Sequence, residues 1–135
     1  MAGLFALYRQ FYRQAADLAG ARAFLSERLE RDQSVIFMAL DGVEPVGFAQ
    51  LFPSFSSAVM ARTFILNDLY VAKRSRGRGV ATKLLRQAAQ FAKGEGAVAL
   101  SLSTAVDNYT AQSLYEREGW KRDQAFFNYR LPITP

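Results

Sequence analysis

The sequence predicts a mixed α/β fold (an α+β mixed sheet), in which helices cover a sheet that is partly antiparallel and partly parallel. The prediction depends on the order of apolar patterns along the chain: two helical stretches, three strand-like stretches, then helix, strand, helix and strand. Three consecutive strands favour an antiparallel meander, and the later strand–helix–strand alternation favours a parallel central pair. A chain of 135 residues suits one domain, which we place at residues 1–135.

Each element follows from a local pattern. Apolar residues at helical spacing predict helices over about 4–15, 19–30, 80–93 and 109–118. The expected apolar face of the second helix is Phe24, Leu25 and Leu29, and that of the third is Val80, Leu84, Leu85, Ala88, Phe91 and Ala92. Apolar and β-branched runs predict strands over 34–40, 46–52, 62–72, 97–103 and 126–131. Asp41-Gly42 indicates a hairpin turn, which we expect to extend to Pro45, and residues 53–57 are expected to form a loop. Asn108 suits the N-cap of the last helix and Gly119 its C′ position.

Composition excludes several kinds of chemistry. The chain has no cysteine and no histidine, which excludes disulfides, thiolate or histidine metal sites and histidine general bases. We therefore expect no metal, and any proton acceptor must be a carboxylate, a tyrosine, an amine or water. The formal net charge of +5 favours anionic partners, and the densest arginine cluster lies at residues 74–78.

The sequence gives no sign of a membrane or export segment. No stretch approaches the roughly 20 apolar residues of a membrane span. The first residues, Met1 to Phe5, lack the basic start and long apolar core of a signal peptide. A cytoplasmic protein without a membrane partner is the expectation.

A glycine-rich turn links the strand at 62–72 to the helix that follows it. Its sequence is Arg74-Ser75-Arg76-Gly77-Arg78-Gly79-Val80-Ala81. Unpaired N–H groups at a helix start, glycines that allow close approach and nearby arginines together predict a site for a phosphorylated ligand. A P-loop does not fit, because Lys83 lies inside the helix, and a Rossmann turn does not fit, because Thr82 stands where its third glycine belongs. On this motif alone, a surface loop of solvated arginines is the alternative.

Two motifs together resemble a known family. Arg-x-x-Gly-x-Gly followed by Val-Ala resembles motif A of the GNAT superfamily, the GCN5-related N-acetyltransferases. The spacing of Asn108, Ala111, Tyr115 and Gly119-Trp120 resembles the second half of that family's pattern. The resemblance extends over about residues 4–131 and implies the GNAT acyl-CoA N-acyltransferase fold. Family members open with a strand, and only three residues precede Leu4, so we expect the first strand to be missing through truncation or a downstream start.

The resemblance also implies a cofactor site for acetyl-CoA, or coenzyme A, used as co-substrate. Amides within residues 76–82 would hold the pyrophosphate, and a bulge near Asn67-Asp68 would let pantetheine pair with the strand edge. A backbone N–H near residues 69–71 would stabilise negative charge on the thioester oxygen. The implied cofactor-binding residues are Leu69, Tyr70, Val71, Arg74, Arg76, Gly77, Arg78, Gly79, Val80, Ala81, Thr82 and Asn108.

Two residues are candidates for proton transfer. Tyr115 matches the family's tyrosine, which would protonate the departing thiol, and the alternative is an ordinary amphipathic helix residue. Asp68 is the only carboxylate in the strand at 62–72. It could attract the acceptor's ammonium group or take its proton through water, and the alternative is a bulge residue that satisfies backbone donors.

The acceptor is the least determined part of the prediction. Residues 67–71 resemble the matching strand of the spermidine/spermine and thialysine acetyltransferase branch, although Asn67 replaces one of two acids there, which weakens a polyamine assignment. We expect N-acetyl transfer to a small-molecule amine by direct attack in a ternary complex. The alternatives are a protein lysine or N-terminal acetyltransferase, a non-catalytic acyl-CoA-binding module, and a basic nucleic-acid binder. No nucleic-acid partner is expected, because most arginines are scattered. A homodimer is expected from the family resemblance, with Phe126-Phe127 contributing.

Overall fold

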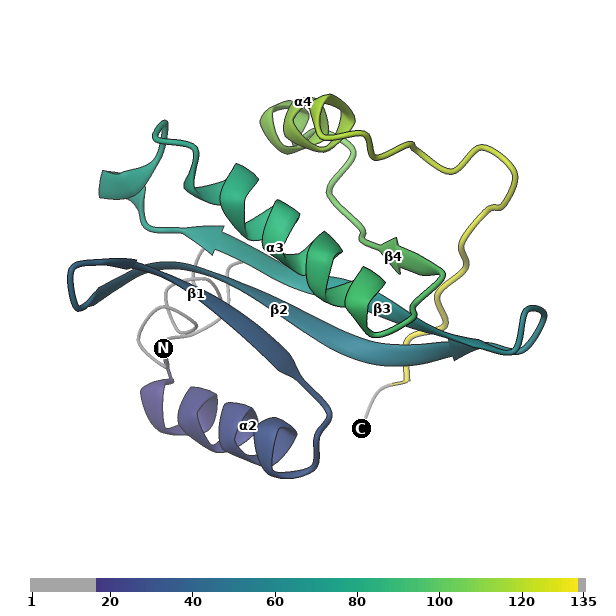
Figure 1. Ribbon diagram of the computed structural model, residues 1–135, viewed down its shortest axis with the longest axis horizontal. Coiled ribbons are helices and arrows are strands. Elements are labelled where there is room, and N and C mark those ends of the chain that lie inside the picture. Colours follow the sequence, from purple (N-terminus) through teal and green to yellow (C-terminus); the bar gives the residue numbers. More distant parts are fainter. Residues whose placement is uncertain (1–16, 134–135) are drawn as a thin grey trace. The chain divides into compact units, whose positions relative to one another are not determined.

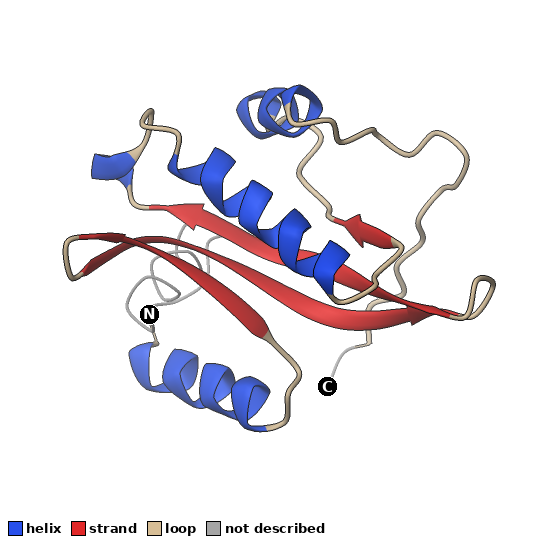
Figure 2. Ribbon diagram, in the orientation of Figure 1, coloured by secondary structure: helices blue, strands red, loops and turns tan. Residues whose placement is uncertain are grey.

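The computed structural model describes residues 17–133 and has the mixed sheet with helices that the sequence predicts (Figures 1 and 2). The elements, in chain order, are α2 (Leu18–Glu30), β1 (Val35–Asp41), β2 (Glu44–Ser56), β3 (Ala61–Val71), the 3-10 turn η1 (Lys73–Ser75), α3 (Val80–Gly94), β4 (Ala99–Ser101) and α4 (Tyr109–Arg117). The chain forms two compact units that meet in sequence at Ser103 and Thr104. The expected helix at 4–15 and the expected loss of an initial strand lie outside the described residues.

The sheet has the order β1-β2-β3-β4. β1, β2 and β3 pair antiparallel, and β3 pairs with β4 in parallel, which confirms the predicted meander and parallel pair. The parallel ladder is short and extends from Thr63 opposite Ala99 to Ile65 opposite Ser101. Among the described residues, the rest of β3 pairs with β2 alone.

Helices α2 and α3 lie on opposite faces of the sheet (Figures 1 and 2). The alternation of side chains along β2 explains this arrangement. Phe48 is buried in a cluster with Ala21 and Leu25 of α2. Its neighbour Gly47 faces the other way and lies against Val80 and Leu84 of α3. The sheet therefore has an apolar face toward each helix.

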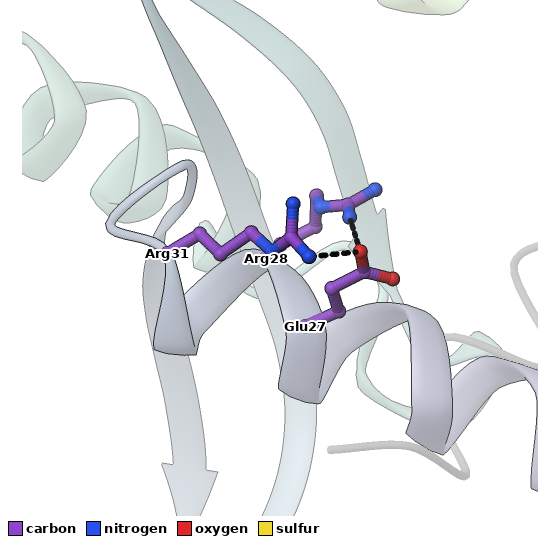
Figure 3. Close-up of polar contacts among 3 residues, drawn as sticks. All are labelled: Glu27, Arg28 and Arg31. Atoms are coloured by element: carbon purple, nitrogen blue, oxygen red, sulfur yellow. Dashed lines mark ion pairs between the residues drawn. The ribbon is translucent and has the colours of Figure 1, made fainter.

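The two helices of this first unit differ in how well their patterns predict burial. The buried face of α3 is the predicted one and consists of Leu84, Leu85, Ala88 and Ala92. Helix α2 instead buries Ala21 and Leu25, while Phe24 and Leu29 of the expected stripe are exposed. On its outer surface Glu27 pairs with Arg28 at 3.0 Å and Arg31 at 3.5 Å (Figure 3). Such exposed pairs contribute little, about 0.3–0.5 kcal/mol for an i,i+4 pair.

Two predictions about the β1–β2–β3 region are wrong. The hairpin turn does not extend to Pro45: Asp41 pairs with Glu44, Pro45 pairs with Leu40, and Gly42 supplies a left-handed φ of 64°. Residues 53–57 are not a loop, because β2 continues to Ser56. Among residues 17–133, β1 pairs no further than Leu51, so position 53 of β2 has a ladder on one side only, and proline is tolerated there.

The predicted strand at 126–131 is also wrong. The structure describes these residues as irregular chain, with Phe126, Phe127 and Tyr129 at 75%, 89% and 93% exposure. Alternating apolar residues make a strand only where a neighbouring strand supplies hydrogen bonds and packing. The predicted strand at 97–103 is shorter than expected, at Ala99–Ser101. Across residues 17–133, no helix has the length and apolar character needed to cross a bilayer.

The contact between β2 and α3 gives a stability prediction. A Cβ added at Gly47 would lie 3.0 Å from the Tyr70 carbonyl oxygen and 3.2 Å from Val80 Cγ1. Gly47→Ala should therefore lower the free energy of unfolding by about 1–3 kcal/mol, the usual cost of overpacking. Thermal or urea denaturation measures this change.

Gly94→Ala is the matched control. No described atom lies within 4 Å of a Cβ at this position, which is the last residue of α3. This variant should be neutral or more stable, by up to about 1 kcal/mol, because alanine restricts the unfolded chain. Equal stability of the two variants would contradict the packing described for Gly47.

Candidate active site

A β-bulge in β3 is the central feature of the first unit. Leu51 of β2 pairs with Leu66, but the next pair is Gln50 with Asp68, so Asn67 is an extra residue between them. This confirms the bulge predicted near Asn67-Asp68. Residues directly opposite in a ladder share a face, and neighbours along β2 do not. On a regular strand, residues two apart lie on the same face of the sheet. Because of the bulge, Asp68 and Leu66 lie on opposite faces instead.

The bulge places Asp68 on the α2 face of the sheet. The α3 face is identified by Phe64, whose ring lies 5.4 Å from the ring of Phe91 in α3. The α2 face is identified by Phe48, which pairs with Tyr70 at a ring distance of 6.4 Å. Asp68 therefore joins Tyr70 on the α2 face, and it is only 4% exposed.

A chain of buried polar side chains ends at the Asp68 carboxylate. Ser34 Oγ donates to Gln50 Oε1 at 2.6 Å, and Gln50 Nε2 donates to Asp68 Oδ2 at 2.5 Å. Asn67 Nδ2 donates to the other oxygen, Oδ1, at 3.3 Å. Sequence reasoning missed Gln50 and Ser34. A glutamine inside the apolar strand run 46–52 was the available signal, because buried amides need partners.

Beyond the bulge, one edge of β3 faces away from β2. The Ala72 N–H donates to the Val46 carbonyl oxygen of β2 at 2.7 Å. Successive residues of a strand direct their N–H groups to opposite edges, so the N–H groups of Val71 and Leu69 point away from β2. The Val71 carbonyl also points away from β2, and its oxygen accepts a hydrogen bond from Arg76 Nε at 2.9 Å. These N–H groups are well oriented for the predicted interaction with a thioester oxygen.

The glycine loop has the backbone conformation that a phosphate site requires. Gly77 and Gly79 have left-handed φ values of 77° and 78°, and no described atom lies within 4 Å of a Cβ built on either. The first intrahelical bond of α3 is from the Lys83 N–H to the Gly79 carbonyl, at 3.1 Å. Within residues 17–133, the N–H groups at 80–82 thus have no partner inside the helix, and Gly79 offers no side-chain cap. Coenzyme A phosphates fit this open backbone.

The three arginines of the loop are placed differently. Arg74 forms an ion pair with Glu44 at 2.8 Å. Arg76, besides its bond to Val71, lies with its guanidinium carbon 5.6 Å from the centre of the Tyr70 ring. Arg78 is exposed between the two glycines. Arg74 and Arg76 are thus held against the protein, whereas Arg78 extends from the loop itself.

The second unit contains α4 with both predicted ends. Asn108 Oδ1 accepts the Ala111 N–H at 3.2 Å, which confirms the N-cap. Gly119 has φ of 93° and donates to Glu116, and Trp120 donates to the Tyr115 carbonyl at 3.0 Å, which is a Schellman ending. The Tyr115 and Trp120 rings lie 6.0 Å apart. Tyr115 is half-buried and therefore also has a structural role at this helix end.

Comparison with known proteins shows the family to which this chain belongs. The family model described as the acetyltransferase (GNAT) family matches residues 1–120. The chain belongs to the GNAT acetyltransferase family. It is 47% identical over 133 residues to the uncharacterized N-acetyltransferase YhfO of Bacillus subtilis (strain 168), covering 98% of this chain and 89% of that protein. The crystal structure of a probable acetyltransferase superposes with a TM-score of 0.94 at 47% identity, covering 99% of this chain and 90% of that one.

More distant relatives have different acceptors in their names. The chain is 35% identical over 98 residues to N-alpha-acetyltransferase 30 of Schizosaccharomyces pombe, covering 73% of this chain and 65% of that protein. It is 33% identical over 84 residues to thialysine N-epsilon-acetyltransferase of Bos taurus, covering 56% of this chain and 49% of that protein. This chain is an acetyltransferase of a family that uses acetyl-CoA as co-substrate.

The loop conformation predicts a separable effect on cofactor binding. Gly79→Ala forces an L-residue into the left-handed region, which costs roughly 1–2 kcal/mol and shifts the amides at 80–82. Affinity for acetyl-CoA should fall at least about tenfold, the equivalent of one charge-assisted hydrogen bond. Calorimetric titration with acetyl-CoA measures the affinity.

Gly96→Ala is the control, because Gly96 has φ of 73° and follows the other end of α3. It should lose similar stability yet bind acetyl-CoA as the wild type does. A Gly79→Ala protein that is folded and binds with wild-type affinity would remove the loop from the cofactor site.

Proposed function

We propose that this chain, acting as a single catalytic domain, transfers the acetyl group of acetyl-CoA to the primary amine of a small molecule. The amine would attack directly in a ternary complex. The observation that carries the proposal is the buried Asp68 carboxylate, which the bulge places on the same face as Tyr70, in the strand whose other edge faces away from β2. A carboxylate in such a place suits a cationic acceptor, because Coulomb attraction is stronger where water is excluded.

The cofactor would be held by main-chain groups of β3, the loop and α3. The amides at 80–82, with the backbone of 76–79, would bind the pyrophosphate, and Arg78 would meet phosphate oxygens. The edge at residues 69–71 would bind pantetheine, and Asn108 would contribute from the start of α4. When bound, acetyl-CoA supplies the acetyl group as an activated thioester.

Asp68 would prepare the acceptor. A free alkylamine has a pKa of about 10 and is mostly protonated at neutral pH, so it must lose a proton before it can attack. Asp68 would bind the ammonium group and accept its proton directly or through water. Only 4% of Asp68 is exposed, so a group that reaches it must be slender. An unbranched primary amine meets that requirement.

Three further groups would act at the thioester. The N–H groups of Leu69 and Val71 point to the edge away from β2 and would donate to the oxygen that becomes negative during attack. One such fixed donor typically contributes about 3 kcal/mol. Tyr115 would protonate the leaving thiol, whose free pKa is about 8.5.

The exposed aromatic residues Phe126 and Phe127 support a homodimer as part of the same proposal. The similarity to a thialysine acetyltransferase supports a small amine acceptor. The similarity to an N-alpha-acetyltransferase makes a protein N-terminus the competing acceptor.

An amine panel with a thiol-release readout tests the proposal. Small primary amines should release coenzyme A faster than a set of unstructured peptides with free N-termini. Asp68→Asn keeps the shape and removes the charge, so kcat/KM should fall about 100-fold, as expected for lost general-base assistance. Affinity for acetyl-CoA should not change. Asp41→Asn makes the same chemical change at the exposed end of β1 and should leave both quantities unaltered.

Three results would count against the proposal. Faster turnover of the peptides than of the small amines would indicate a protein N-terminus as the acceptor. Absence of thiol release despite tight acetyl-CoA binding would indicate a binding module. Wild-type kcat/KM in Asp68→Asn would exclude the carboxylate from catalysis.

Tyr115→Phe isolates the phenolic hydroxyl. Turnover should fall at least about tenfold, because an unassisted thiolate leaves more slowly. Acetyl-CoA affinity and thermal stability should hardly change, since the ring that packs near Trp120 remains. Tyr109→Phe, an exposed position on the same helix, is the control. Unchanged turnover in Tyr115→Phe would leave Tyr115 with its structural role alone.

A further inference from the structure

We propose that Gln50 and Ser34 are positioning residues, which lock the Asp68 carboxylate in the orientation that receives the acceptor amine. The inference rests on the role of Asp68 proposed above. It concerns side chains that do not touch the reacting atoms, and it depends on the hydrogen-bonded chain Ser34–Gln50–Asp68.

The chain has only one consistent direction. An ionised carboxylate can only accept hydrogen bonds, so Gln50 must present its NH₂ group to Asp68. The amide oxygen of Gln50 then faces Ser34, and the serine hydroxyl must donate to it. The Asp68 carboxylate therefore sets the direction of the whole chain, and the Ser34 hydroxyl, by donating to the amide oxygen, holds the Gln50 amide in that orientation.

Burial makes this arrangement restrictive. Gln50 is 0% exposed, Asp68 4% and Ser34 8%. A buried amide or carboxylate that loses its partner has no bulk water to replace it, so departures from this geometry are costly. Ser34 directly precedes β1, Gln50 belongs to β2 and Asp68 to β3, so three adjacent segments of the sheet hold the carboxylate.

The two carboxylate oxygens are held unequally. Gln50 is 2.5 Å from Oδ2, whereas Asn67 is 3.3 Å from Oδ1 and is itself exposed. The shorter contact, from Gln50, is the one that fixes the plane of the carboxylate. Small errors in such geometry are expensive in catalysis, because proton transfer depends on distance and alignment.

The principal test is Gln50→Met, which keeps a long side chain of similar volume and removes the donor. We expect kcat for the best amine to fall about tenfold or more, which is part of the roughly 10²–10⁴-fold that general-base catalysis contributes. The Kd of acetyl-CoA should not change. Combined with Asp68→Asn, the substitution should add almost nothing to the loss in kcat that Asp68→Asn causes alone. A purely structural glutamine would instead give additive losses.

Ser34 provides a graded version of the same test. Ser34→Ala should lower kcat less than Gln50→Met does, and Ser34→Thr should restore it, because threonine keeps the hydroxyl. This pair decides the question if Gln50→Met does not fold. Equal kcat in Ser34→Ala and wild type, together with wild-type kcat in any folded Gln50→Met, would overturn the proposal.

Phe64→Leu is the matched control for lost stability. Phe64 is buried on the same strand but on the opposite face, against Phe91. The Phe64→Leu substitution should lower the melting temperature of the protein and leave kcat unchanged. A kcat loss in Phe64→Leu equal to that in Gln50→Met would overturn the positioning role. Wild-type activity of Asp68→Asn would instead refute the proposed function itself, so the two failures are distinguishable.

Discussion

One extra residue in β3 determines both chemical features of the first unit. If β3 were regular and Asn67 were an ordinary paired residue, Asp68 would share the face of Phe64 and Leu66 against α3. The bulge brings it onto the face of Gln50 and Tyr70. A bulge also bends its strand, and the parallel ladder between β3 and β4 ends at Ile65, just before it. A single local irregularity thus accounts for a buried carboxylate and for a backbone edge that a ligand can pair with.

The site is built almost entirely from one continuous segment. The bulge, the edge at 69–71, the glycine loop and the start of α3 follow one another from Asn67 to Thr82. Helix α3 is anchored by its buried face and by the close approach of Gly47 to Val80 and Leu84, so the amides at its start have a fixed position. The proposed phosphate site therefore depends on core packing as well as on the loop, and the buried carboxylate is held by Gln50 of a neighbouring strand.

The sequence predicted what local rules control. Helical period identified the buried face of α3, and cap chemistry identified Asn108 and Gly119. Contacts between residues far apart in the sequence could not be predicted in this way. Whether β2 can contain Pro53 depends on where its neighbour β1 ends. The alternating apolar residues at 126–131 do not form a strand in the structure. The partners of Asp68 depend on a register shift between β2 and β3, which the sequence of one strand does not reveal, so Gln50 and Ser34 were missed.

Deletion of Asn67 tests the central claim most directly. Removing the extra residue leaves Asp68 opposite Gln50 but makes β3 regular, so the edge beyond Ile65 should close toward β4. The account predicts a folded protein whose acetyl-CoA affinity, measured by calorimetric titration, falls at least about tenfold, equivalent to about 1.4 kcal/mol. A folded deletion variant that binds acetyl-CoA as tightly as the wild type would contradict it.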